Sequence, residues 1–109
     1  MPYRAPGFTV LYRWRLHPDK EQSFIAAWSR RTEQLRAEGS LGSRLHKGAD
    51  GLWYSYAQWP SAEFRERVFA KGSSDPEASR QMREAVIEEF PELVLEPVAD
   101  FLVLPPGQD

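Results

Sequence analysis

The chain contains no cysteine, which excludes disulfide bonds, thiolate catalysis, thiolate zinc sites and iron–sulfur clusters together. Long apolar runs are also missing. No stretch approaches the roughly 20 apolar residues that a membrane helix needs, so no membrane partner is expected. The first seven residues contain two prolines and no apolar run, unlike a signal peptide. We therefore expect a cytoplasmic protein.

An excess of charge of one sign is absent too. The 14 basic and 16 acidic residues give a net charge of −2, and the basic residues are spread along the chain. Nucleic-acid binding needs a clustered basic face, so no nucleic-acid partner is expected. Of the two histidines, His17 follows the end of the first predicted strand and His46 lies in another, which argues against a metal site. No glycine-rich phosphate loop or nucleophile elbow is present, and no cofactor is predicted.

Aromatic residues, in contrast, are plentiful: four tryptophans, four tyrosines and six phenylalanines favour a folded chain. A length of 109 residues suits one domain, predicted over 1–109 with tails at 1–7 and 105–109. A domain of this size buries a limited fraction of its surface, so association with another chain would stabilise it.

The first half of the chain carries clear local patterns. Alternating apolar residues predict a strand over 8–16, and apolar residues at helical spacing predict a helix from about 19 to 38. Asp19 and Gln22 have the spacing of a capping box. An Asp-Gly turn between the runs 41–47 and 52–59 predicts a hairpin. The stripe along the helix reads Phe24, Trp28, Arg31 and Leu35.

The second half predicts a broken helix followed by a strand. Ser61 and Asp75 are suitable caps for its two pieces. Pro91 is predicted to end the second piece, and the apolar run 93–104 is predicted to be the last strand. The residues that recur every fourth position in the second piece are Met82, Val86 and Phe90.

The order of these elements is that of the split βαβ ferredoxin-like fold, an α+β antiparallel sheet with helices on one face. Apolar residues occur on both faces of the predicted last strand, and the helices can cover one face only. The second face predicts another layer, most simply the same sheet of a second subunit. We therefore expect a sheet-to-sheet homodimer.

Residues 39–46 (GSLGSRLH) and 50–61 (DGLWYSYAQWPS) resemble the antibiotic biosynthesis monooxygenase family of dimeric α+β barrels. The resemblance runs from about residue 8 to residue 69 and independently implies a homodimer. The family includes cofactor-independent monooxygenases of aromatic polyketides, haem-degrading enzymes and members of unknown activity.

Three positions of this chain can be compared individually with the residues that the family uses. Trp59, before Pro-Ser, matches the family tryptophan that lines the substrate pocket. Four residues earlier, where the quinone-forming members resemble one another in an asparagine, this chain has Ser55 and contains no asparagine elsewhere. The haem-degrading members use a histidine on the following helix, whereas residues 67–70 contain none. Haem degradation is therefore not expected.

The hairpin allows a prediction about faces. A loop of two or four residues would place six residues on one face: Arg44, His46, Trp53, Ser55, Ala57 and Trp59. Small residues between large aromatic ones leave space, which predicts an apolar pocket with a few polar groups. The alternative is an ordinary sheet face whose gaps are filled by helix side chains.

Roles follow from the residue types on that face. His46 is the candidate general base, because an imidazole titrates near neutral pH, and Arg44 is the candidate for stabilising an enolate or phenolate. Trp59 would shape the cavity, with Trp53, Ser55 and Ala57 binding the substrate. The alternatives are an exposed strand histidine and an arginine paired with a surface carboxylate. Arg30 and Arg31 are interpreted as part of a solvated helix face.

Two hypotheses about function result. The first is a cofactor-independent monooxygenase-like enzyme that acts on a small, hydrophobic, phenolic or polyketide-like aromatic substrate. It would deprotonate the substrate, hold the carbanion in a dry pocket and let oxygen react with it directly. The alternative is a non-catalytic dimer that binds a hydrophobic small molecule or a protein partner.

Overall fold

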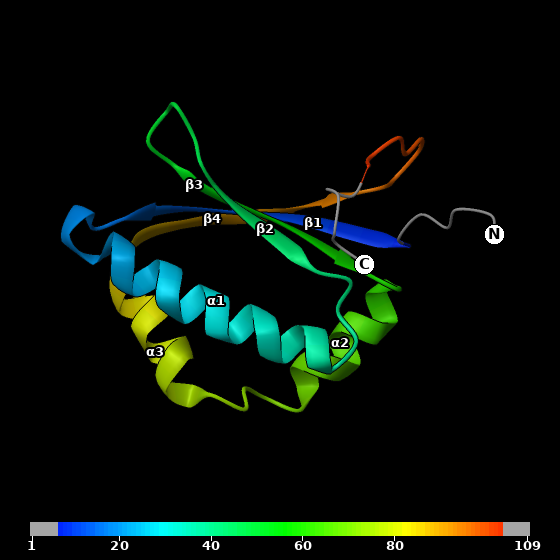
Figure 1. Ribbon diagram of the computed structural model, residues 1–109, viewed down its shortest axis with the longest axis horizontal. Helices are drawn as coiled ribbons and strands as arrows, with labels where there is room; N and C mark the ends of the chain where they lie inside the picture. Colours follow the sequence, from blue (N-terminus) through cyan, green and yellow to red (C-terminus); the bar gives the residue numbers. More distant parts are fainter. Residues whose placement is uncertain (1–6, 104–109) are drawn as a thin grey trace.

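The computed structural model describes residues 7–103 and contains four strands and three α-helices in that range (Figure 1). In chain order the elements are β1 (Phe8–Leu16), the 3-10 turn η1 (Pro18–Lys20), α1 (Glu21–Ala37), β2 (Ser43–Lys47), β3 (Trp53–Trp59), α2 (Ala62–Ala70), α3 (Pro76–Ala85) and β4 (Val86–Leu95). Gly7 apart, the two predicted tails lie outside the described residues.

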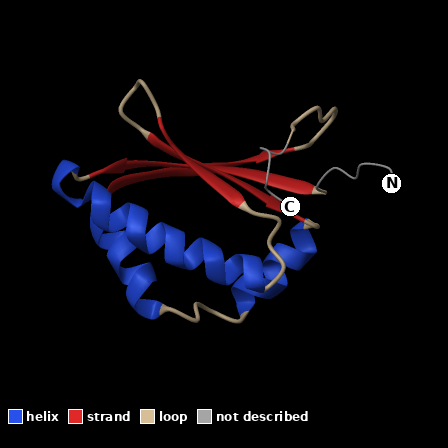
Figure 2. Cartoon of the chain, viewed as in Figure 1, coloured by secondary structure: helices blue, strands red, loops and turns tan. Residues whose placement is uncertain are grey.

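The strands form one antiparallel sheet in the order β2-β3-β1-β4. All the helices lie on one side of this sheet (Figure 2). The predicted α+β ferredoxin-like fold, with its two βαβ halves and helices on one face, is therefore confirmed.

The ends of the first helix follow the sequence in part. The predicted capping box of Asp19 and Gln22 is wrong: the chain enters α1 through η1, and Lys20 at the N-cap makes no side-chain cap bond. The predicted end of the helix at about residue 38 is confirmed, and Gly39 follows it. Its φ of 113° is a left-handed conformation that only glycine adopts without strain, and it turns the chain toward β2.

The two later helices begin where their caps predict. The Ser61 hydroxyl accepts a hydrogen bond of 3.0 Å from the backbone N–H of Phe64, which starts α2. The Asp75 carboxylate accepts a hydrogen bond of 3.0 Å from the backbone N–H of Ala78, which starts α3. Both caps satisfy an amide that the first helical turn leaves unpaired.

The predicted boundary between the last helix and the last strand is wrong. Helix α3 ends at Ala85, and β4 begins at Val86 with no loop between them. Residues 96–103 have no regular secondary structure, and residue 104 lies outside the described residues. Pro91 lies within β4 at an irregularity in its pairing with β1, on an edge strand where a missing N–H is tolerated.

Two clusters of buried side chains fill the space between sheet and helices. The first contains Trp14, Leu16, Phe24, Trp53 and Ala85. The second contains Ala57, Trp59 and Val68. Tyr12 of β1 packs against both clusters, so it marks the region where they meet.

The opposite face of the sheet has no helix over it in the described range (Figure 2). It carries Leu11 and Leu93, which pair across β1 and β4, together with Tyr54, Tyr56 and Leu95. Leu93 and Leu95 are 43% and 39% exposed. We call this surface the open face. No helix in residues 7–103 has the length and hydropathy needed to cross a membrane.

Candidate functional site

A cavity of about 270 Å³ lies between α1 and the helix-facing side of the sheet. Its lining comes from β1, α1, β2, β3, α2 and α3: Tyr12, Trp14, Trp28, Arg31, Thr32, Leu35, Ser43, Ser55, Ala57, Trp59, Phe69 and Met82. The β3 contribution follows from strand alternation, because Ser55, Ala57 and Trp59 are successive residues on one face. Two of these three side chains are small, which leaves room beneath α1.

Aromatic rings form much of the cavity wall. Trp59 is 1% exposed and packs edge-on against Phe69 of α2, with ring centroids 5.5 Å apart. On the β1 side, Tyr12 and Trp14 stack with their centroids 6.0 Å apart. Flat apolar walls of this kind favour a flat apolar ligand.

The cavity also holds a hydrogen bond that joins its two sides. The indole N–H of Trp28 in α1 donates to the hydroxyl of Ser55 in β3 over 3.2 Å. Ser55 is 2% exposed, so its hydroxyl is withdrawn from solvent. Because the Ser55 oxygen accepts this bond, its own proton is still available for donation.

Two further donors in the cavity lining have no partner. The Nη1 atom of Arg31 and the Nε1 atom of Trp59 are both shielded from solvent and make no hydrogen bond within the described part of the chain. Buried donors are nearly always paired in folded proteins, so two unpaired donors at one cavity indicate a place for acceptor atoms.

Tyr12 adds a neutral hydroxyl to the cavity wall. Burial raises the pKa of Tyr12 above its ordinary value of 10.0, and the neighbouring Arg65 guanidinium offsets part of that rise. Tyr12 is therefore protonated at neutral pH and does not serve as a base. Arg65 lies over the rings of Tyr12 and Phe69 and forms an ion pair of 2.7 Å with Glu92.

The structure separates the six predicted site residues into three groups. Ser55, Ala57 and Trp59 line the cavity. Trp53 shares their face of β3 but packs into the first core cluster, with its ring centroid 6.5 Å from that of Phe24. The remaining two, Arg44 and His46, lie on the other side of the sheet.

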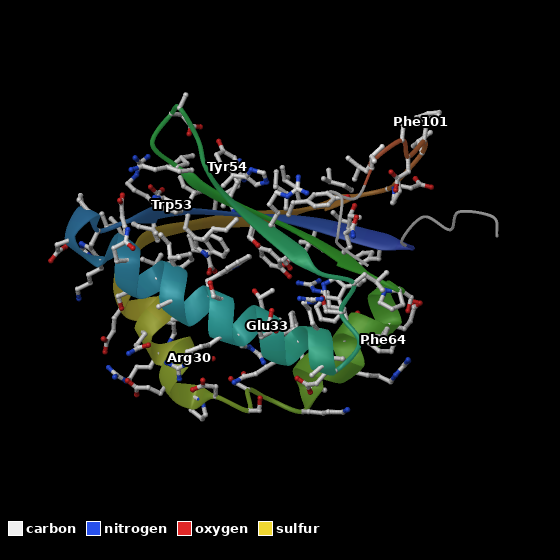
Figure 3. All side chains as sticks on the ribbon, viewed as in Figure 1. Arg30, Glu33, Trp53, Tyr54, Phe64 and Phe101 are labelled. Atoms are coloured by element: carbon white, nitrogen blue, oxygen red, sulfur yellow. The ribbon has the colours of Figure 1, made fainter. Side chains whose placement is uncertain are left out.

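The predicted common face for all six residues is wrong, and the reason is the length of the loop. Arg44 pairs with Tyr56 and His46 pairs with Tyr54, so both belong to the open face. Lys47 pairs with Trp53, which leaves residues 48–52 as the connection. An odd number of loop residues reverses the parity that a loop of two or four would give. Figure 3 shows Trp53 and Tyr54 on opposite sides of the sheet.

Arg44 and His46 therefore do not line the cavity with Trp59. Arg44 is exposed and borders a separate groove at the β2 edge, together with Tyr56, Gln58 and Leu102. The exposed position of His46 agrees with the alternative considered for it, a strand histidine in contact with solvent. Arg44 is exposed as its alternative requires, but it forms no ion pair with a carboxylate among residues 7–103.

Sequence reasoning missed Arg31. Next to Arg30, it is interpreted from the sequence as part of a solvated helix face, yet Arg30 pairs with Asp75 while Arg31 lines the cavity. The signal was present in the stripe that runs through Phe24, Trp28 and Leu35, because Arg31 occupies an apolar position of that stripe. A charged residue at a core-facing position is an indication of a site.

The described part of the chain offers few side chains for binding a metal ion or for accepting a proton at the cavity. Residues 7–103 contain no group of three His, Cys, Asp or Glu side chains arranged to hold a metal ion. The cavity lining, as far as the structure describes it, contains no histidine and no carboxylate. What it offers is an apolar volume with hydrogen-bond donors at its wall.

Solved structures of other proteins share this fold. A Mycobacterium tuberculosis protein, Rv0793, superimposes with a TM-score of 0.68 at 22% identity, covering 85% of this chain and 96% of its own. SnoaB, a cofactor-independent oxygenase from Streptomyces nogalater, gives 0.66 at 18% identity, covering 93% and 99%. A conserved protein from Methanosarcina mazei gives 0.70 at 13% identity, covering 84% and 92%.

A search of curated proteins finds no match to this sequence. The sequence pattern of the family described as antibiotic biosynthesis monooxygenase matches residues 7–67, which is more than half of the chain. This segment runs from β1 into α2 and includes Ser55, Ala57 and Trp59 of the cavity. The chain belongs to the antibiotic biosynthesis monooxygenase family.

Proposed function

We propose that this chain is a cofactor-independent monooxygenase that oxidises a small, planar, phenolic substrate in the cavity beneath α1. The observation that carries the proposal is the apolar, aromatic-walled cavity that contains Trp59. Its volume of about 270 Å³ lies just below the range of about 300–1,000 Å³ of typical ligand pockets, which suits a small aromatic molecule.

The chemistry requires no bound redox group, because the substrate supplies the electrons. A phenol and one molecule of oxygen give a quinone and one molecule of water: one oxygen atom enters the ring, and the other leaves as water. The phenol must first lose its proton, because the electron-rich anion is the species that reacts with oxygen. With no histidine or carboxylate in the described lining, we assign the proton to water.

We further propose that the protein acts as a homodimer joined through the open face. The apolar side chains there, including Leu11, Leu93 and Leu95, are not covered by any helix or second sheet formed by residues 7–103. A second sheet would remove them from water, and each Å² of apolar surface buried contributes about 25 cal/mol. Arg44 and His46 then lie at or beside that interface rather than in the cavity.

Oxygen uptake tests the proposed activity. We expect the purified chain to consume oxygen with 1-naphthol in the absence of added cofactor and to release naphthoquinone. With ¹⁸O₂, one labelled atom should appear in the quinone and the other in water. Thr32→Phe, which places a ring in the cavity, should abolish uptake. Glu33→Phe, a neighbour on the exposed side of α1, should not change it.

A second candidate, a ligand-binding dimer without catalysis, is favoured by the missing base. The described cavity lining contains no histidine and no carboxylate, and Ser55 stands where the quinone-forming members resemble one another in an asparagine. Binding of 1-naphthol without oxygen uptake, blocked by Thr32→Phe but not by Glu33→Phe, would support this candidate and overturn the first.

A further inference from the structure

The cavity beneath α1 has one charge in its described lining, and that charge is positive. Arg31 contributes it from the middle of α1. The neighbouring arginines of the helix have acidic partners: Arg30 pairs with Asp75, and Arg36 pairs with Glu33. The Nη1 atom of Arg31 has no hydrogen-bond partner among residues 7–103, although it is shielded from solvent.

Two other polar groups of the lining, in Trp59 and Ser55, add hydrogen-bond donors to this positive charge. The indole N–H of Trp59 is a donor without a partner. The hydroxyl of Ser55 already accepts a hydrogen bond from Trp28, so it can still donate its own proton to a ligand. No carboxylate is available in the described lining to neutralise Arg31. The described lining therefore holds two unpaired donors and no negative charge, and its side-chain acceptors are neutral hydroxyl groups.

From this pattern we infer that the cavity binds its ligand as an anion, with a flat apolar body against the aromatic wall and an ionised oxygen at Arg31. This inference rests on the proposed function only in treating the cavity as the binding site. The ligand class is an aryl oxyanion. Arg31 and the Trp59 indole are the groups that bind its oxygen.

An arginine in this position has a chemical consequence for a bound phenol. A positive charge favours the ionised form of a neighbouring acid, and the effect is larger in a cavity with little water than in bulk solvent. Burial by itself raises the pKa of a phenol, as it does at Tyr12. Direct donation from Arg31 and from the Trp59 indole to the phenol oxygen acts in the opposite direction, and we expect these two donors to outweigh burial, so that the phenolate forms without a protein base. In this way Arg31 would promote ionisation of the phenol in a cavity whose described lining has no histidine or carboxylate to act as a base.

The test uses 4-nitrophenol, whose phenolate absorbs visible light, and its uncharged ether 4-nitroanisole. Bound to the wild-type protein, the phenol should ionise about 1–3 pH units below the free phenol. Arg31→Met should remove this shift and weaken binding of the phenolate by about tenfold or more. Binding of 4-nitroanisole should stay within about twofold, because the apolar wall is unchanged.

Two further variants control for charge and folding. Arg36→Met removes a positive charge from an exposed part of the same helix, and both the pKa shift and the affinity should stay at wild-type values. Arg31→Lys keeps a charge but not the planar guanidinium, and should retain part of the shift. If Arg31→Met does not fold, as judged by circular dichroism, Arg31→Gln replaces it as the variant that removes the charge.

The outcomes separate this inference from the proposed activity. An unchanged shift in Arg31→Met, or wild-type protein that binds 4-nitroanisole as tightly as the phenolate, would overturn the inference. Oxygen uptake in that situation would leave the monooxygenase proposal intact. Binding of the phenolate with the expected shift but without oxygen uptake from any phenol would overturn the monooxygenase proposal and support the inference. Absence of binding of both probes would overturn the inference.

Discussion

The indole N–H of Trp28 in α1 donates a hydrogen bond of 3.2 Å to the hydroxyl of Ser55 in β3, and this bond connects the helix layer to the sheet at the cavity. The two residues are 27 positions apart in the chain and lie at the cavity. The bond therefore helps to hold the two sides of the cavity at their observed spacing. Its loss should affect stability and the shape of the cavity together.

Ser55→Ala should lower the free energy of unfolding by about 1 kcal/mol, because the Trp28 indole then lacks its acceptor. Urea unfolding measures the change. Ser55→Thr keeps the hydroxyl and should cost less. In a double-mutant cycle, Trp28→Phe with Ser55→Ala should cost less than the sum of the single changes. Strict additivity of the two changes would show that the hydrogen bond contributes nothing.

Gly39→Ala should destabilise the chain by more than about 1 kcal/mol, for two reasons that act together. The φ of 113° is strained for alanine, and the added Cβ would come within 2.3 Å of the Phe64 ring. Gly42→Ala is the matched control, because its φ of 103° is similar and no atom lies within 4 Å of the added Cβ. Thermal melting should rank Gly39→Ala below Gly42→Ala, and equal melting temperatures would contradict the predicted clash.

Asp75 should make stability depend on pH. The hydrogen bond from the Ala78 amide, followed by the Arg30 guanidinium, holds the pKa of the Asp75 carboxyl below its ordinary value of 3.8. A carboxyl with a depressed folded-state pKa contributes stability above its unfolded-state pKa and loses it as pH falls through the folded-state pKa. The melting temperature of wild type should exceed that of Asp75→Asn at neutral pH, and the difference should shrink at acidic pH. If the difference in melting temperature stays constant down to acidic pH, the Asp75 carboxylate does not contribute this stability.

The open face should determine the oligomeric state. Leu93→Lys places a charge among the apolar residues that pair across β1 and β4, and should convert a dimer to a monomer in sedimentation at micromolar concentration. Val94→Lys is the control, because Val94 is the next residue along β4, pairs with Val10 and points to the helix side. A wild-type monomer, or equal effects of both changes, would be inconsistent with dimerisation through this face. A specific interface should bury more than about 1,000 Å² in total.

The sequence predicts elements well where the signals are local. The alternation along β1 and the caps at Ser61 and Asp75 depend on neighbouring residues, and the structure has them as expected. The end of α3 was misplaced because Met82, Val86 and Phe90 fit a helical period equally well. Pairing with β1 decides the outcome, and that pairing joins residues 70 or more positions apart.

The candidate site was predictable only in part for a similar reason. The small residues Ser55 and Ala57 before Trp59 correctly indicate space on that face, because their alternation is local to β3. The side of β2 on which His46 lies depends on how many residues the turn contains, and the turn signal Asp-Gly does not specify that number. Arg31 was overlooked because a pair of arginines on a helix is usually solvated.

The five-residue connection between β2 and β3 also bears on how relatives of this chain diverge. Deleting one residue at that tip, with β3 held in place, would turn every side chain of β2 over, so that Arg44 and His46 would exchange sides with Leu45. An insertion or deletion far from the cavity would thereby change which chemistry reaches it, without any substitution in a strand. Aligned strands alone are therefore a poor guide to equivalent residues; turn lengths must be compared first.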